Sequence, residues 1–492
     1  MKTLSLLKKT MLLCIAMLFV YACEEKKKEK QDEETENTTS HAEAQTTYTL
    51  ASADTPSTPC DCDSSWFPHT QTPAPLEGEN SPFAASETTN CIFHQWSWQK
   101  FLWLTVPDTT TSKTPLFLRD ADITQVDPYM NPVTIPTGVS LALSTKEAEQ
   151  AGSSAILESN PNFNTNGVSG TVFYAIYMNS TMNTAAKEFA TGLSNGTIKP
   201  SNSKAFPVGS FELKTSWIPT SVIPAADLAD YYTTMASIDG TTVEVAMLGM
   251  HVVGVVENHP EFIWATFEHN NLAPAFDWTE GTASSDTETL LFKKGSVSTI
   301  DGIKWTGTSM SEAYTLFEYG VPRVKGAPTS NFMTTSQSEP ENYNNIKTID
   351  HCVASNLKDI WNNYAYTGSI WINTDGLTSA QQIALLKSEG YGLGSATPGS
   401  VARGSLNSAN ISMETYTQTF NSSLESIDAS NLVNCLSCHS AVSFSDGSST
   451  SPLYISHVFN GYLEHQKGTT ETAIDMMKIK EFQQNFIEKK KE

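Results

Sequence analysis

The middle of the chain alternates apolar and polar residues in several short runs that are bounded by glycine, proline or asparagine. β-Branched and aromatic residues are enriched in these runs, which is typical of strands with one buried face. The runs cover residues 170–177, 209–217, 242–257 and 261–269, and a turn at 258–260 joins the last two. Residues 183–193 have a helical pattern that ends at Gly196. The pattern predicts an antiparallel or mixed sheet with helical insertions.

Helical periodicity dominates on both sides of this region. In residues 93–104, bulky aromatic residues recur at spacings of three and four, which predicts a buried helix. From about residue 331 onward the pattern is helical, with clear stretches at 348–364 and 378–388. We therefore expect an α+β fold with a β-rich N-terminal and middle body over residues 60–328. A helical C-terminal region over residues 329–492 follows it.

The first residues have the layout of a secretory signal peptide. Three lysines flank the start of an apolar run, Met11–Tyr21, which is too short to span a bilayer. The run ends at Ala22-Cys23, and this junction resembles the site at which bacterial lipoprotein signal peptidase cuts before a cysteine. We expect residues 1–22 to be removed and Cys23 to be lipidated. Ordinary signal cleavage is the alternative.

The charge of the chain limits the partners it can bind. The chain has 30 Lys and Arg against 53 Asp and Glu, a net charge of −23. This charge repels nucleic-acid phosphates and anionic lipid headgroups, so we expect no nucleic-acid partner. Residues 23–59 lack apolar periodicity and are expected to form a disordered acidic tether. Acyl chains on Cys23 would therefore have to provide the membrane anchor.

One motif carries recognisable chemistry. Residues 434–439 read NCLSCH, a single C-x-x-C-H. In this pattern two thiols form thioethers with the vinyl groups of a haem, and the histidine supplies the proximal nitrogen to the iron. We expect one covalently bound haem c on Cys435 and Cys438, with His439 as the proximal ligand and a short helix beginning near Asn431. A redox-active dithiol and half of a zinc site are the alternatives.

The ligand opposite His439 decides between an electron carrier and a catalyst. A methionine or histidine at this distal position blocks access to the iron, whereas an open position admits peroxide or dioxygen. Met413 upstream and His457 downstream are the candidate distal ligands, and His465, Met476 and Met477 are further residues of suitable type. The aromatic helix at 93–104 is a candidate haem wall or electron route.

The expected hairpin contains an unusual share of the ten histidines. His251, Glu268 and His269 are candidate acid–base or metal-binding residues, because imidazole and carboxylate groups transfer protons and bind metals. The alternative is structural. His251 then lies on an apolar strand as a buried histidine, His259 belongs to the turn, and His269 bonds a neighbouring loop.

Four further cysteines are Cys60, Cys62, Cys91 and Cys352. Export places them in an oxidising compartment, where disulfides are expected. Since Cys60 and Cys62 are too close to bridge each other comfortably, at least one of them should pair with Cys91 or Cys352. A metal site that combines Cys60, Cys62 and Cys91 with His69 or His94 is the alternative.

Several segments together resemble those of one protein family. They are WSWQKFLWLT (96–105), GSFELKTSW (209–217), LGMHVVG (248–254), FIWATFEHNN (262–271), SANISMETY (408–416) and NCLSCHS (434–440). In order and spacing they resemble a family of exported, largely uncharacterised bacterial c-type cytochrome proteins. The resemblance implies that Cys435, Cys438 and His439 hold the haem. It also implies that His251, Glu268, His269, Met413 and Glu414 lie near a shared site.

These observations lead to one expected function and two alternatives. We expect a mono-haem c-type cytochrome lipoprotein that transfers electrons at the outer membrane or in the periplasm. Its lipid anchor would hold it on the periplasmic face or the cell surface, and its partner would be a redox protein or a small-molecule oxidant. The first alternative is a haem-dependent oxidoreductase, peroxidase- or oxygenase-like, with an open iron site. The second is a surface binding module whose haem is structural.

Overall fold

The computed structural model describes most of the chain after residue 59. The described residues are 60–86, 88–110, 113–145, 157–164, 166–273, 276–277, 282–283, 285, 287–291, 314–315, 339–394, 401–404, 410–413 and 435–483. They belong to one compact unit, Ala51–Glu492. The expected signal peptide, the tether with Cys23, the boundary at 328/329 and the helix start near Asn431 lie outside the described residues.

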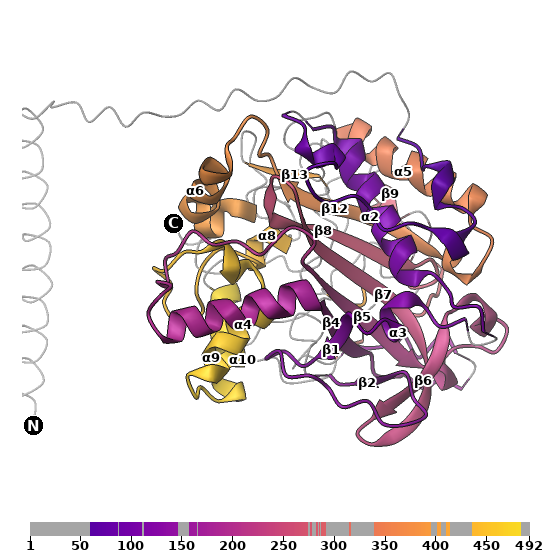
Figure 1. Cartoon of the computed structure of the whole chain (residues 1–492). Coiled ribbons are helices and arrows are strands. Elements are labelled where there is room, and N and C mark those ends of the chain that lie inside the picture. Colours follow the sequence, from indigo (N-terminus) through magenta and orange to yellow (C-terminus); the bar gives the residue numbers. More distant parts are fainter. Residues whose placement is uncertain are drawn as a thin grey trace, which may run out of the picture. The chain divides into compact units, whose positions relative to one another are not determined.

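A nine-stranded sheet forms the centre of the described part of the chain (Figure 1). Its strands are β1 (Ile123–Val126), β2 (Leu141–Leu143), β4 (Phe173–Asn179), β5 (Phe211–Pro219), β6 (Thr233–Ile238), β7 (Thr241–Val256), β8 (His259–His269), β12 (Tyr364–Ile372) and β13 (Ala402–Gly404). The main order is β1-β4-β5-β7-β8-β12-β13, with β6 paired to the first half of β7 and β2 paired to β6. All pairs are antiparallel except β2 with β6. Two short ladders join β3 (Leu157–Glu158) to β11 (Tyr314–Thr315) and β9 (Phe276–Asp277) to β10 (Thr282–Ala283).

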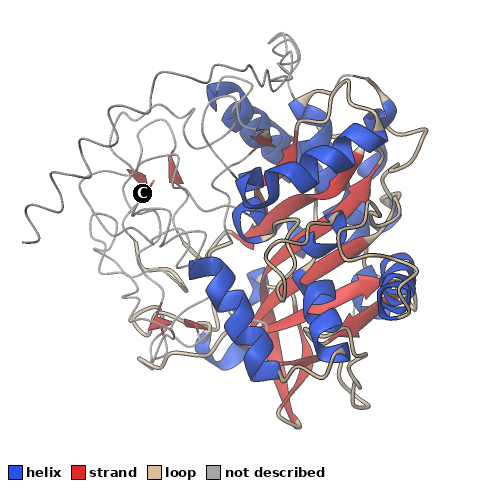
Figure 2. Ribbon diagram, turned by 90° about the vertical axis from the view of Figure 1, so that its left-hand side faces the viewer, coloured by secondary structure: helices blue, strands red, loops and turns tan. Residues whose placement is uncertain are grey.

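Helices lie on both sides of the strands (Figure 2). The α-helices are α2 (Asn90–Thr105), α3 (Leu116–Arg119), α4 (Ser180–Ser194), α5 (Glu339–Asn356), α6 (Ser379–Glu389), α8 (Cys435–Cys438), α9 (His457–Gln466) and α10 (Glu471–Gln483). Short 3-10 helices are η1 (Ser64–Trp66), η2 (His69–Gln71), η3 (Pro82–Ala84), η4 (Thr220–Val222), η5 (Leu228–Asp230), η7 (Ile360–Asn363), η8 (Gly390–Gly394) and η10 (Pro452–Ile455). Within the described residues, none of these helices has the length and apolarity to cross a membrane.

The sheet separates two sets of buried side chains, as expected from the alternation of side chains along each strand. One face packs against α2 and α5, which Figure 1 shows side by side. Here Phe101 stacks on Phe267 with ring centres 4.1 Å apart, and Phe93 stacks on Trp371 at 4.0 Å. We call this the α2 face. The opposite face, which we call the α9 face, packs against α4, α6, α8 and α9 at one end. A separate cluster that includes Leu248 and Met413 covers its other end.

The sequence predicted most of these elements correctly. The mixed α+β class, the buried helix α2, strands β4, β5, β7 and β8, and helices α4 and α6 are confirmed. The α6 helix begins with a capping box in which Thr378 accepts from the Gln381 amide and the Gln381 side chain accepts from Thr378. The 258–260 turn was misplaced, because His259 already pairs with Val256 in the sheet.

The sequence predicted a helical C-terminal region, but the structure also has strands there, β12 and β13. The expected helix at 348–364 ends at Asn356, and Tyr364 begins strand β12. The β12 strand pairs with β8 on one side and β13 on the other. Its two faces are covered as well, since Tyr366 and Trp371 belong to the cluster on the α2 face and Ile370 and Ile372 to the cluster on the α9 face. A strand with apolar side chains on both faces lacks the apolar–polar alternation of a half-exposed strand, and this explains the wrong prediction.

Two disulfides attach the start of the described chain to the α2 face. Cys60 bonds to Cys91 in α2, and Cys62 bonds to Cys352 in α5. The disulfide prediction is therefore confirmed, and the alternative metal site is not formed. His69 instead contacts Asp359 at 2.6 Å, and His94 contacts the Tyr366 hydroxyl at 2.8 Å.

Candidate haem-binding site

The C-x-x-C-H motif forms a short helix on the α9 face of the sheet. Helix α8 contains both cysteines, and the His439 amide donates to the Cys435 carbonyl at 2.8 Å, which continues the turn. Leu436 is fully buried in the cluster that also contains α4, α6 and α9 residues. The side chain of Cys438 lies outside the described residues, so its position beside Cys435 is known from the backbone only.

The hydrogen bond between His439 and Ile455 indicates which nitrogen of the neutral His439 ring carries the proton. The His439 Nδ1 lies 2.9 Å from the carbonyl oxygen of Ile455. A carbonyl only accepts, so Nδ1 must carry the proton, and Nε2 then carries the lone pair. Ligating histidines usually bind the metal through one nitrogen and donate the other N–H in this way. The imidazole therefore has the tautomer that a proximal haem ligand requires.

Two aromatic rings pack against the His439 imidazole. The Trp264 ring centre lies 4.1 Å away with an interplanar angle of 37°, and the His457 ring centre lies 4.0 Å away at 30°. The Trp264 indole N–H in turn donates to the Glu261 carbonyl at 3.2 Å. Strand β8 thus supports the motif histidine from the sheet, while His457 supports it from the start of α9.

The start of α9 is itself held by the sheet. Ser456 caps the helix by accepting from the Phe459 amide, and its hydroxyl donates to Glu212 Oε2 at 2.9 Å. Burial raises the pKa of Glu212 to about 7, although the Ser456 hydrogen bond and the charge of Lys214 oppose the rise. Glu212 was not singled out in the sequence, because nothing local to β5 indicates that α9 covers it.

A polar row crosses three adjacent strands on the same face. Lys214 in β5 pairs with His251 in β7, which pairs with Thr266 in β8. The His251 Nδ1 lies 2.8 Å from the Thr266 hydroxyl. Lys214 and His251 are half-buried although they lie on central strands of the sheet. The row is two residues along β8 from Trp264, so this polar surface lies beside the motif.

Glu268 connects the polar row to the segment that carries Met413. The Ile411 amide donates to Glu268 Oε1, and the Asn410 side chain donates to the Phe267 carbonyl at 3.1 Å. The Ser412 hydroxyl lies 2.6 Å from the Ser216 hydroxyl of β5. The structure therefore brings the segments around His251, Glu268 and Met413 onto one face. Met413 itself is buried in the cluster that includes Leu248, which shares no residue with the cluster around the motif.

His269 does not join this group. As the neighbour of Glu268 in a strand it points to the α2 face, where its ring contacts Tyr364 with centres 5.1 Å apart. Its ring also stacks on Tyr231, with centres 3.6 Å apart. Its Nε2 donates to the Asp230 carbonyl at 3.0 Å, and its Nδ1 accepts from the Asn271 amide at 3.1 Å. Burial lowers the pKa of His269 to about 4. The expected acid–base group of three residues is therefore wrong for His269, which is a neutral structural histidine.

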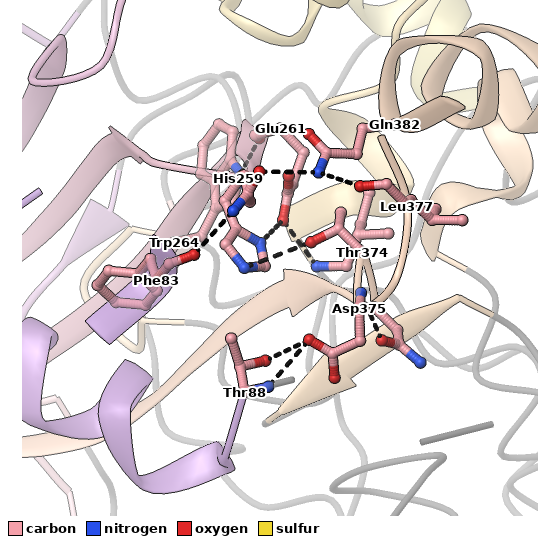
Figure 3. Close-up of polar contacts among 12 residues, drawn as sticks. Phe83, Thr88, His259, Glu261, Trp264, Thr374, Asp375, Leu377 and Gln382 are labelled. Atoms are coloured by element: carbon pink, nitrogen blue, oxygen red, sulfur yellow. Dashed lines mark hydrogen bonds and ion pairs between the residues drawn. The ribbon is translucent and has the colours of Figure 1, made fainter. Parts of the chain in front are cut away.

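A buried histidine–carboxylate pair was missed in the sequence (Figure 3). His259 Nδ1 lies 2.8 Å from Glu261 Oε1, which also accepts from the Ile372 amide at 2.9 Å. The Thr374 hydroxyl lies 3.4 Å from His259 Nε2. Both members of the pair are buried, and the pair joins β8 to β12 just before Trp264. Its only local sign is the spacing of a histidine and a glutamate with one residue between them.

His439 is compatible with the axial position of a haem. A haem brings its own four nitrogen ligands and needs one axial nitrogen from the protein, which His439 can supply. Within the described residues, no three His, Cys, Asp or Glu side chains gather as metal ligands. The apolar surroundings of Leu436 and Trp264 suit a porphyrin, which is itself largely apolar.

Comparison with known proteins adds no relative: no family model, no curated protein and no solved structure matches the chain.

Proposed function

We propose that this protein is a mono-haem c-type cytochrome lipoprotein that transfers electrons at the outer membrane or in the periplasm. The observation that carries the proposal is the hydrogen bond between His439 Nδ1 and the Ile455 carbonyl. It gives the histidine of a C-x-x-C-H motif the tautomer needed for an axial ligand. Cys435 and Cys438 would hold the haem covalently, and the haem iron would supply one-electron redox chemistry.

The surroundings of His439 also support an electron carrier. Trp264 and Leu436 are buried beside the motif, and they limit contact between water and the axial ligand. Low polarity and a hydrogen bond to the proximal imidazole are the features by which a protein tunes a haem potential. The electron partner is a redox protein or a small-molecule oxidant.

Loss of both motif cysteines tests the haem proposal. In Cys435→Ser with Cys438→Ser, thioether bonds cannot form, and we expect no covalent haem in a denaturing gel stained for peroxidase activity. Ser437→Ala keeps both thiols and serves as the control, which should stain like the natural protein. Full staining of the double variant would overturn the proposal.

The membrane anchor has its own test. Cys23→Ala removes the acyl attachment site, and the variant should move from the membrane fraction to the soluble fraction after cell breakage. The control is Cys14→Ala, which lies in the expected signal peptide and should leave the protein with the membranes. A Cys23→Ala protein that still sediments with membranes would contradict lipidation at this residue.

A haem-dependent oxidoreductase is the second candidate, and the polar row favours it. Lys214 and His251 are half-buried on central strands, which is unusual for groups of this polarity. The Thr266 hydroxyl, hydrogen-bonded to His251 Nδ1, would orient the imidazole for proton transfer to or from a bound oxidant. In this case His251→Ala should abolish peroxidase turnover while covalent haem is retained.

The visible spectrum separates the two candidates. A six-coordinate low-spin haem that ignores added cyanide or carbon monoxide indicates an electron carrier. A high-spin haem that binds these ligands readily indicates the oxidoreductase. The control for His251→Ala is His351→Ala, because His351 is an exposed histidine of α5 on the other side of the molecule's sheet. Equal peroxidase turnover in the two variants would show that His251 has only a structural role.

A further inference from the structure

If the proposed function holds, the position of His457 relative to His439 indicates whether His457 can be the second ligand of the haem iron. Two axial histidines bind a haem iron from opposite faces, each through one nitrogen. With metal–nitrogen bonds of about 2 Å, the centres of two such rings lie roughly 6 Å apart and meet end to end. A distance of only about 4 Å between the two ring centres is incompatible with this arrangement.

In the structure the two imidazoles pack against each other as tilted rings. Their centres are 4.0 Å apart and their planes differ by 30°, and this distance is too short for one iron to be bonded between the two rings. Since Nδ1 carries the proton, His439 would bind a haem iron through Nε2, at the edge of its ring. His457 packs beside this ring at 4.0 Å and would therefore lie on the same side of the haem as His439.

We propose that His457 is a positioning residue for the proximal ligand and that it does not bind the iron from the distal side. Together with Trp264 it holds the plane of the His439 imidazole, while the Ile455 carbonyl holds Nδ1. These three contacts restrict rotation of the ring about its Cβ–Cγ bond. The protein would therefore set the direction in which Nε2 points before a haem binds.

Both positioning rings are connected to the central sheet. His457 is the first residue of α9, whose capping residue Ser456 donates to Glu212 in β5. The Phe444 ring also contacts His457, with centres 5.1 Å apart and an angle of 63°. Trp264 belongs to β8 and is held by the Glu261 carbonyl. The sheet thus supports the proximal side of the site through two separate strands.

Two substitutions of His457 distinguish positioning from ligation. His457→Phe keeps an aromatic ring of similar size but removes both nitrogens, so it retains packing and abolishes ligation. His457→Ala removes both the packing of the ring and the possibility of ligation. The measurements use the full-length haem-loaded protein and record covalent haem content, the ferric and reduced spectra, carbon monoxide binding and the midpoint potential.

If His457 is a positioning residue, His457→Phe keeps the spin state, the midpoint potential and the response to carbon monoxide of the natural protein. His457→Ala shifts the midpoint potential and changes the response to carbon monoxide, because the His439 ring is then less firmly oriented. Trp264→Leu should behave like His457→Ala, because it removes the other ring.

Two results would overturn the inference. Conversion of low-spin haem to high-spin haem in His457→Phe would show that His457 binds the iron. Identical potentials and responses to carbon monoxide in His457→Ala and the natural protein would show that the ring does not position His439. A natural protein without covalent haem is a different outcome, because it refutes the proposed function from which this inference starts.

Discussion

At the residue scale, burial shifts the pKa values of His269 and Glu212 in opposite directions. His269 is buried with both nitrogens hydrogen-bonded, and its pKa is lowered to about 4. Glu212 lies under α9 beside Lys214, and its pKa is raised to about 7. In both cases burial favours the neutral form of the side chain, because the charged form of an acid or a base loses its hydration when it is buried.

The titration of His269 should make the protein less stable in acid. An unfolded histidine binds a proton below its ordinary pKa of 6.5, whereas folded His269 does so only below about 4. The unfolded state therefore binds more protons between these values, and the free energy of unfolding falls as the pH falls, by at most about 3 kcal/mol. Urea unfolding from pH 7 to pH 4 should show a shallower decline in His269→Gln. His351→Gln, at an exposed position, should keep the natural slope.

Glu212 should have the opposite effect on stability. The folded carboxyl group stays protonated up to about pH 7, whereas the unfolded group loses its proton above about 4.5. The stability due to the protonated form is thus present below pH 4.5 and is lost as the pH rises to 7. Glu212→Gln retains an oxygen for the Ser456 hydroxyl and cannot titrate. The free energy of unfolding of Glu212→Gln minus that of the natural protein should therefore increase from pH 4.5 to 7. A difference that stays constant over this range would contradict the predicted titration of Glu212.

At the scale of elements, the α9 face depends on a close approach between β7 and residues 410–413. A Cβ atom added at Gly249 would lie 2.8 Å from the Asn410 side-chain nitrogen and 2.9 Å from the Phe267 carbonyl oxygen. These distances are shorter than ordinary contacts, so glycine is required where the segment crosses the strand. The same segment donates an amide to Glu268.

Gly249→Ala should therefore separate the 410–413 segment from the sheet. The side chain of Asn410 can move, but the Phe267 carbonyl belongs to the β8 backbone and cannot. We expect a loss of about 1 to 3 kcal/mol in the free energy of unfolding, as for other overpacked sites. Gly78→Ala is the matched control, because nothing lies within 4 Å of the Cβ that it adds. Equal stability of the two variants would show that the contact relaxes freely.

At the scale of the whole molecule, the two disulfides close loops of very different length. Cys60 and Cys91 are 31 residues apart, whereas Cys62 and Cys352 are 290 apart. The second bond joins the start of the described chain to α5, across the entire β-rich region. A cross-link that closes a longer loop removes more conformational freedom from the unfolded chain.

Removal of the longer cross-link should consequently be more destabilising. Cys62→Ala with Cys352→Ala should lower the free energy of unfolding by about 2 kcal/mol more than Cys60→Ala with Cys91→Ala, from the difference in loop entropy. Urea unfolding of both double variants measures this difference. A larger loss in the Cys60 and Cys91 variant would mean that local packing, and not chain entropy, determines the effect of each bond.

The sequence alone determined the local features of this protein. Periodicity identified α2 and the strands β4, β5, β7 and β8, because each of these elements has a local pattern of buried positions. The C-x-x-C-H spacing identified Cys435, Cys438 and His439 as candidate haem residues, because this chemistry resides in adjacent residues. Because side chains alternate along a strand, the adjacent positions of Glu268 and His269 also indicate that the two residues lie on opposite faces of the sheet.

Only the tertiary structure decided which distant residues surround His439. Trp264, Ile455 and the Glu212–Ser456 contact come from separate elements, and no local pattern indicates that they meet. Strand β12 was missed for a related reason, since its side chains enter the buried clusters on both faces of the sheet and therefore lack the alternation of a half-exposed strand. Packing between elements depends on the whole chain, so the residues that surround and orient His439 can be identified only in the folded structure. The candidate reactive residues are adjacent in the chain and can be identified from the sequence.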